Sequence, residues 1–268
     1  MNTLKIRSIE LGAGVPKTNC PYCRKNQRDD SRKGRINYEA PCGFSWMACR
    51  FLWWPVQHSC APRNPQGFTQ YSGQYSDTVH HPLLFTIRTK PEGGEVAPSF
   101  EDYAKVNVAV AESGNANLVD VEMFWGNTDW NGQVSEVSAK LVDAIHKTKC
   151  AVVGSRHSFS MTPKQGEILH ALQEQKKAGA DIPKVAVMPT SDKDVVTLIA
   201  ASVDFKAETD RPFLTISMGP RGMVSRMACE LSGSCMTFGA AGQVSAPGQI
   251  QVKDLKDALN MIHTAQQG

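Results

Sequence analysis

Residues 150–189 read CAVVGSRHSFSMTPKQGEILHALQEQKKAGADIPKVAVMP, and this stretch decides the fold. The apolar runs near its two ends, CAVVGSR and KVAVMP, are typical of buried strands. Between them, Ile168, Leu169 and Leu172 recur at helical spacing, which predicts an amphipathic helix. A strand, a helix and a second strand in this order predict two parallel strands joined by a helical crossover.

The same alternation runs through the chain from Pro82 onward. Further strand candidates are LLFTIR, LVDVEMF, FLTISMG and CMTFGA, and helices are predicted over residues 99–114 and 191–207, the latter with Ser191 as its N-cap. Eight such strands would close a (β/α)8 TIM barrel, so we expect one α/β barrel domain over residues 1–268. Residues 4–12, LKIRSIELG, alternate in polarity and predict a small hairpin.

Two residues of the opening stretch indicate chemistry. A lysine on an apolar strand is disfavoured as a cation, so burial would favour the neutral, nucleophilic amine of Lys184. A neutral amine can form a Schiff base with a ketone. His157, at the end of the preceding strand candidate, could then move protons. Taken singly, each has an ordinary alternative: a surface lysine at a strand start and a structural histidine in a loop.

Several strings in the second part of the chain occur in a fixed order. They are PLLFTIRTKPEGGE, LVDVEMF, GSRHSFSMTP, GADIPKVAVMP, TISMG, TFGA and SAPGQI, spread from Pro82 to about His263. Together they resemble the type I 3-dehydroquinate dehydratases, which catalyse the third step of the shikimate pathway. The resemblance implies a lyase that removes water from 3-dehydroquinate to give 3-dehydroshikimate. It also implies that neither a metal nor an organic cofactor is needed.

The resemblance assigns three catalytic roles. Lys184 would form the imine, His157 would act as general base and then as general acid, and Glu92 in KPEGGE would orient the histidine. Asp120 in LVDVEMF would join the same network or hold a loop arginine.

It also implies a substrate-binding set. Arg226 would bind the substrate carboxylate through two parallel hydrogen bonds. Arg88 is a second cationic candidate, and Ser245 and Gln249 lie in a loop that would close over the substrate. Two alternatives stay open: a remnant that only binds ligands or proteins, and another Schiff-base barrel such as an aldolase, against which Arg226 and SAPGQ argue.

Residues 19–81 depart from the family pattern. They hold five of the eight cysteines and show no sustained helical or strand periodicity. The family's first two barrel strands are expected here, and the second supplies a glutamate and an arginine that bind substrate hydroxyls. Residues 45–49 read SWMAC instead. We therefore expect this chain to be unstable or weakly active.

A shifted reading frame would explain this departure. Read from the second base of each codon, residues 19–28 permit IVPIVGKTR and residues 46–54 permit GWRVDFFGG, which resemble the missing strands. Our hypothesis is a frame shift near Thr18 with a compensating shift near His81. The coding DNA tests it: a verified gene with this frame, shared by its orthologues, would contradict a sequence error.

Two other interpretations of this segment are weaker. The CPYC motif of residues 20–23 matches a redox site, but a polar stretch without an apolar helical face follows it. A zinc site built from Cys20, Cys23, Cys42 and Cys49 would lack a second close cysteine pair.

Composition limits the partners. The net charge of +3 is too small to argue for nucleic acid or membrane binding. No stretch reaches the roughly 20 apolar residues that a membrane helix needs, and the N-terminus has no signal-peptide pattern. We expect a cytoplasmic protein with reduced cysteines, and the resemblance implies a homodimer.

Overall fold

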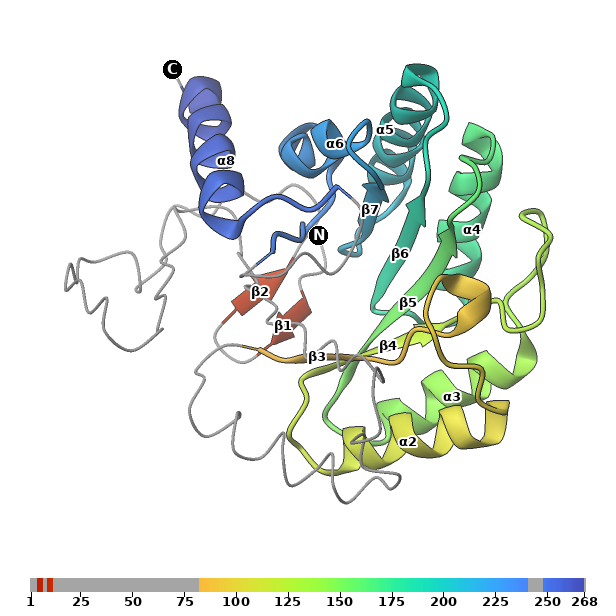
Figure 1. The fold of residues 1–268 in the computed structure, drawn as a ribbon. Coiled ribbons are helices and arrows are strands. Elements are labelled where there is room, and N and C mark those ends of the chain that lie inside the picture. Colours follow the sequence, from red (N-terminus) through yellow and green to blue (C-terminus); the bar gives the residue numbers. More distant parts are fainter. Residues whose placement is uncertain (1–3, 7–8, 12–81, 241–247, 268) are drawn as a thin grey trace.

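The computed structural model describes residues 4–6, 9–11, 82–240 and 248–267. Within these ranges the chain forms one five-stranded parallel sheet, with its strands in sequence order (Figure 1). The strands are β3 (Leu84–Thr86), β4 (Leu118–Glu122), β5 (Ala151–Ser158), β6 (Ile182–Val187) and β7 (Leu214–Ser217). Several sequence predictions fall on residues outside these ranges. They are the shifted frame, the redox motif and the zinc site of residues 19–81, and the role of Ser245.

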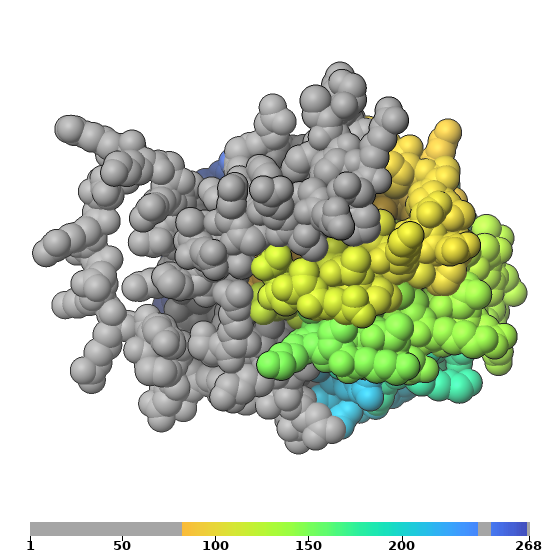
Figure 2. All heavy atoms as spheres, turned by 90° about the horizontal axis from the view of Figure 1, so that it is seen from below, coloured from red at the N-terminus to blue at the C-terminus, as the bar shows by residue number. Residues whose placement is uncertain are grey.

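Helices α2 to α5 connect the strands and lie on the outer side of the curved sheet (Figure 1). They are α2 (Phe100–Glu112), α3 (Glu136–His146), α4 (Gln165–Lys177) and α5 (Asp192–Glu208). Viewed from below, α2 and α3 pack side by side on the molecular surface (Figure 2). Each strand is followed by a helix and then by a parallel neighbour, as residues 150–189 predict.

Strand alternation separates two apolar cores. Val119, Val121 and Val185 belong to the larger cluster between the sheet and its helices. Leu118 and Ile182, in the same strands but an odd number of residues away, belong to a second cluster on the inner face. Because successive side chains point to opposite faces, every second residue of β4, β5 and β6 enters the interior.

Local signals explain most of the helix starts. The predicted N-cap Ser191 accepts a hydrogen bond from the Asp194 amide and begins α5 with a capping box. Ser135 accepts a hydrogen bond from the Ser138 amide and caps α3, a helix that was not among those predicted from the sequence. The expected N-terminal hairpin is confirmed as β1 (Leu4–Ile6) paired antiparallel with β2 (Ile9–Leu11).

The region after β7 differs from expectation. The CMTFGA run is not a regular strand in the described structure, where its main chain bonds to other main-chain segments near its two ends. The Cys235 amide donates to Phe213 O, and the Ala240 amide donates to Ile250 O. The remaining elements are the 3-10 turn η1 (Lys90–Glu92), α6 (Met223–Met227), α7 (Cys229–Ser232) and α8 (Val252–Gln267). Among the described residues, no helix is long and apolar enough to cross a membrane.

Candidate active site

Lys184 projects into the interior from the third position of β6. It alternates with Ile182 and Ala186, which belong to the inner apolar cluster, and it pairs with Ser155 of β5. Its side chain is buried, and Nζ lies 2.9 Å from Asp120 Oδ2 and 5.7 Å from the Phe238 ring centre. Burial lowers the pKa of Lys184 below its ordinary value, although Asp120 opposes this effect. The neutral amine is therefore more accessible here than at an exposed lysine.

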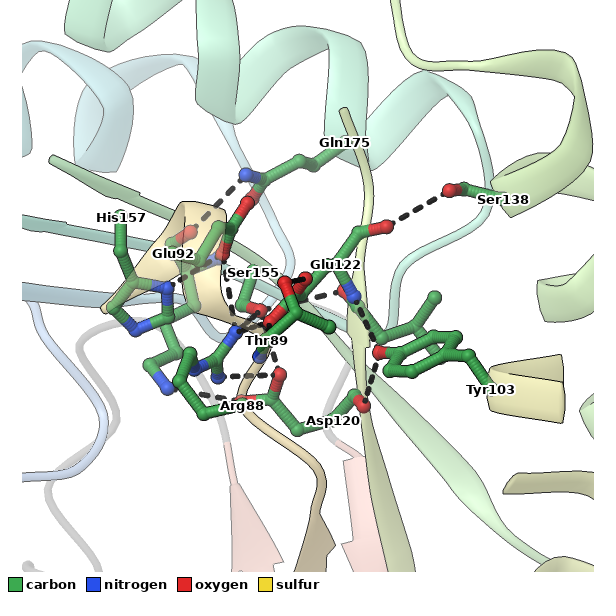
Figure 3. Close-up of polar contacts among 12 residues, drawn as sticks. Arg88, Thr89, Glu92, Tyr103, Asp120, Glu122, Ser138, Ser155, His157 and Gln175 are labelled. Carbon is green, nitrogen blue, oxygen red and sulfur yellow. Dashed lines mark hydrogen bonds and ion pairs between the residues drawn. The ribbon is translucent and has the colours of Figure 1, made fainter. Parts of the chain in front are cut away.

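Arg88 lies between three buried carboxylates. Its guanidinium nitrogens are 2.7 Å from Asp120 Oδ1, 2.9 Å from Glu122 Oε1 and 3.1 Å from Glu92 Oε2 (Figure 3). Burial alone would lower the pKa of Arg88, but these carboxylates raise it above the ordinary value, so the guanidinium stays charged. Burial alone would raise the pKa of Asp120, but Arg88 and Lys184 lower it. Asp120 is thus an ionised carboxylate that lies between the Arg88 guanidinium and the Lys184 amine.

His157 is bound to the acid that the sequence analysis assigns to it. His157 Nδ1 lies 2.8 Å from Glu92 Oε2, and both side chains are largely buried (Figure 3). Burial, together with Arg88 and Lys184, lowers the pKa of His157 well below its ordinary value. Burial and Glu122 raise the pKa of Glu92 well above its usual range. When Nδ1–H of the neutral imidazole donates to Glu92 Oε2, Nε2 is the unprotonated nitrogen and can accept a proton.

One continuous polar chain therefore joins the amine to the imidazole. It runs from Lys184 through Asp120, Arg88 and Glu92 to His157. His157 lies two residues beyond Ser155, the partner of Lys184, which places its main chain about 6.6 Å further along the strand. A substrate carbonyl at the amine would hold its neighbouring carbon near the imidazole.

Arg226 approaches the same region from α6. Its side chain is buried, and Nη1 donates to Phe238 O at 3.2 Å, the residue whose ring faces Lys184. Burial lowers the pKa of Arg226 to about 10. Phe238 therefore connects Arg226 with the region of Lys184.

Gln249 is half-buried in the loop that follows the undescribed residues 241–247. Gly248 beside it has φ 73°, and a Cβ there would come 2.1 Å from Gly219 O. Only glycine fits this close approach, which holds the loop against the end of β7. Gln249 therefore lies at the carboxyl end of the sheet, the same edge near which His157 lies in β5.

The structure adds residues that sequence reasoning did not select. Glu122 accepts from the Thr89 amide at 2.8 Å and from Thr89 Oγ1 at 2.6 Å, which fixes the start of the loop that carries Glu92. Tyr103 lies beneath them and donates to Asp120 O while accepting from the Glu122 amide (Figure 3). Period-two spacing from Asp120 indicates Glu122, but no sequence signal indicates Tyr103, because it reaches the strand from α2.

Comparison with known proteins agrees with this geometry. The family model described as type I 3-dehydroquinase matches residues 61–266. The 3-dehydroquinate dehydratase of Clostridioides difficile (strain 630) is 36% identical over 262 residues, covering 97% of both chains. The enzyme of the same name from Salmonella agona (strain SL483) is 36% identical over 267 residues, covering 99% of this chain and 100% of the other.

Solved structures give the same family. The type I 3-dehydroquinate dehydratase from Clostridium difficile, determined with covalent modified comenic acid, superposes with a TM-score of 0.68 at 39% identity, covering 75% of this chain and 77% of the other. The 3-dehydroquinate dehydratase from Geobacillus kaustophilus HTA426 gives 0.70 at 32% identity, with 75% and 76% covered. These matches place the parallel sheet described above within a TIM barrel, and the chain belongs to the type I 3-dehydroquinate dehydratase family.

Proposed function

We propose that this chain dehydrates 3-dehydroquinate through a Schiff base on Lys184, with His157 as general base and then general acid. The dehydratase activity follows from membership of the family. The observation that carries the finer proposal is the largely buried chain of polar contacts from Lys184 to His157. The Clostridium difficile relative was solved with a covalently modified ligand, which also supports covalent chemistry in this family.

The reaction follows from the charges of the site. The neutral amine of Lys184 attacks the substrate ketone, and loss of water gives an imine whose protonated form draws electrons from the adjacent carbon. His157 takes the proton from that carbon, and the electron pair forms an enamine. The enamine expels the β-hydroxyl group, which leaves as water with the proton held by His157. Hydrolysis of the imine releases the enone and restores the amine.

Further residues support these steps. Asp120 holds the amine, and Glu92 holds the imidazole in one orientation. We assign Arg226, Ser245 and Gln249 to substrate binding, with Arg226 binding the substrate carboxylate.

We also propose that the chain forms one domain and a cytoplasmic homodimer. A measurement of the molar mass in solution tests the dimer.

Replacing His157 with alanine tests whether imine formation and proton abstraction depend on different residues. Imine formation needs the amine, whereas proton abstraction needs the imidazole. We therefore expect turnover to fall by roughly 10²- to 10⁴-fold. The imine should still accumulate, seen by mass spectrometry as a protein adduct after borohydride reduction. His170→Ala is the control, because His170 Nε2 contacts only Gly132 O in the described structure. Unchanged turnover in His157→Ala would exclude it as the base.

Turnover of the chain as written is a separate prediction. Residues 45–49 lack the family's glutamate–arginine pair, and each lost polar contact to a substrate hydroxyl would weaken binding by about 1–3 kcal/mol. We expect a kcat/KM well below that of the Salmonella agona relative, measured by absorbance of the enone. Restoring the frame-shifted strands should recover it. Equal kcat/KM in both proteins would refute this prediction, and binding without any turnover would favour the remnant interpretation.

A further inference from the structure

The main chain of Lys184 is held by a side chain from outside the barrel. Gln175 lies in the last turn of α4 and is fully buried. Its Oε1 accepts from the Lys184 amide at 2.7 Å, and its Nε2 donates to Lys184 O at 3.1 Å. Figure 3 shows this side chain reaching from its helix toward the strand. Both ends of one amide group are therefore bound to one residue of the sheet.

The residue type at this position is unusual for its surroundings. Ile168, Ala171 and Leu172 form the rest of the buried face of α4, at the spacing of an apolar stripe. A leucine at position 175 would continue that stripe without the desolvation of an amide. The two hydrogen bonds to Lys184 offset that desolvation, so the side chain is adapted to this one contact.

Two bonds on one residue restrain its position and its rotation. The amide groups of a strand normally bond to neighbouring strands, which share any displacement. Gln175 instead connects the main chain of Lys184 to a helix that packs against both β5 and β6. The Lys184 side chain starts from this main chain and meets Asp120 with Nζ at 2.9 Å, so the position of the main chain limits where the amine can lie.

We propose that Gln175 is a positioning residue for Lys184, which holds the strand so that the amine meets the substrate carbonyl on the side of His157. This inference rests on the proposed Schiff-base function. A displacement of about 1 Å at a reacting group lowers rates by on the order of 10²-fold. A residue that served helix packing alone would change stability and leave the chemistry of the folded molecules unchanged.

The experiment compares Gln175→Leu, Gln175→Glu and Ser202→Ala with the wild-type full chain. Ser202 is the control because it is also fully buried on an outer helix, and its Oγ lies 2.7 Å from Thr215 Oγ1 rather than from the main chain of Lys184. Activity is normalised to the folded fraction. For Gln175→Leu we expect kcat to fall by roughly 10- to 100-fold, KM to stay within about twofold, and borohydride trapping at Lys184 to slow by the same factor as kcat.

Gln175→Glu adds a second measurement, the pH dependence of kcat, which a role in packing alone would leave unchanged. A buried carboxyl has a raised pKa, and its neutral form keeps an acceptor for the Lys184 amide and an O–H donor for Lys184 O. The ratio of its kcat to that of the wild type should be near one at low pH and fall as the carboxyl ionises. Ser202→Ala should keep wild-type kcat at every pH.

The outcomes separate the two proposals. Wild-type trapping at Lys184 with an unchanged kcat and trapping rate in Gln175→Leu overturns the positioning role alone. A pH-independent ratio for Gln175→Glu also counts against it. Failure to trap the wild-type protein overturns both proposals.

Discussion

Lys184→Met is expected to abolish turnover while the protein stays folded. The amine would be the only group that forms the covalent bond, and removing such a nucleophile lowers kcat by on the order of 10⁴- to 10⁶-fold. Methionine fills the space of the lysine stem, and Asp120 keeps its contacts with Arg88 at 2.7 Å and with Ser155 at 2.6 Å. Because burial already disfavours the lysine cation, we expect the free energy of unfolding to change by no more than about 1–2 kcal/mol.

A second lysine provides the control. Lys206 on α5 donates to Glu230 O at 3.1 Å, outside the polar chain of the site. Lys206→Met should therefore keep wild-type kcat in the same enone assay. Turnover by Lys184→Met within tenfold of the wild type would show that the reaction proceeds without this amine.

Arg88→Met is expected to have the largest effect on stability. It would leave Asp120, Glu122 and Glu92 buried without the guanidinium that neutralises them. Breaking a buried ion pair by removing one partner costs about 3–5 kcal/mol, so we expect a loss of this size in chemical denaturation. The stability of the wild-type protein should also depend on pH through Asp120. Asp120 has a lowered pKa in the folded state, so its contribution is present above the unfolded pKa of about 3.9 and is lost as the pH falls.

A coupled variant separates charge from packing. Arg88→Met combined with Glu122→Gln removes one of the unpaired carboxylates and should be more stable than Arg88→Met alone. Arg211→Met is the control, because Arg211 bonds to Ala180 O at 2.9 Å and its loss should cost only about 1 kcal/mol. A loss below 1 kcal/mol in Arg88→Met would contradict the charge balance described here.

The sequence predicted the repeating strands and helices because local patterns specify them. Apolar runs and helical spacing located β3 to β7, and Ser191 located the start of α5. The quoted strings predicted the family, and the structure brings Lys184, Asp120, Arg88, Glu92 and His157 into one chain of contacts. Strand alternation explains part of this, because Asp120, Lys184 and His157 lie at interior positions of β4, β6 and β5. Arg88 and Glu92 reach them from the segment that follows β3.

The sequence could not predict contacts that depend on three-dimensional packing. Tyr103 and Gln175 reach strand residues from helices, and their spacing resembles that of ordinary core positions. The CMTFGA run has strand composition, but within the described residues it forms no regular strand and its main chain meets other main-chain segments near its two ends. Amino-acid composition indicates that a run favours a strand, but it does not indicate which neighbouring strand the run would pair with.

Borohydride reduction in the presence of 3-dehydroquinate tests the central claim most directly. Reduction of an imine makes the bond permanent, so the wild-type protein should gain the mass of one reduced substrate and lose activity. Peptide mapping should place that mass on Lys184, and Lys184→Met should gain none. A wild-type protein that turns over substrate with no adduct, or with the adduct on another lysine, would contradict the account.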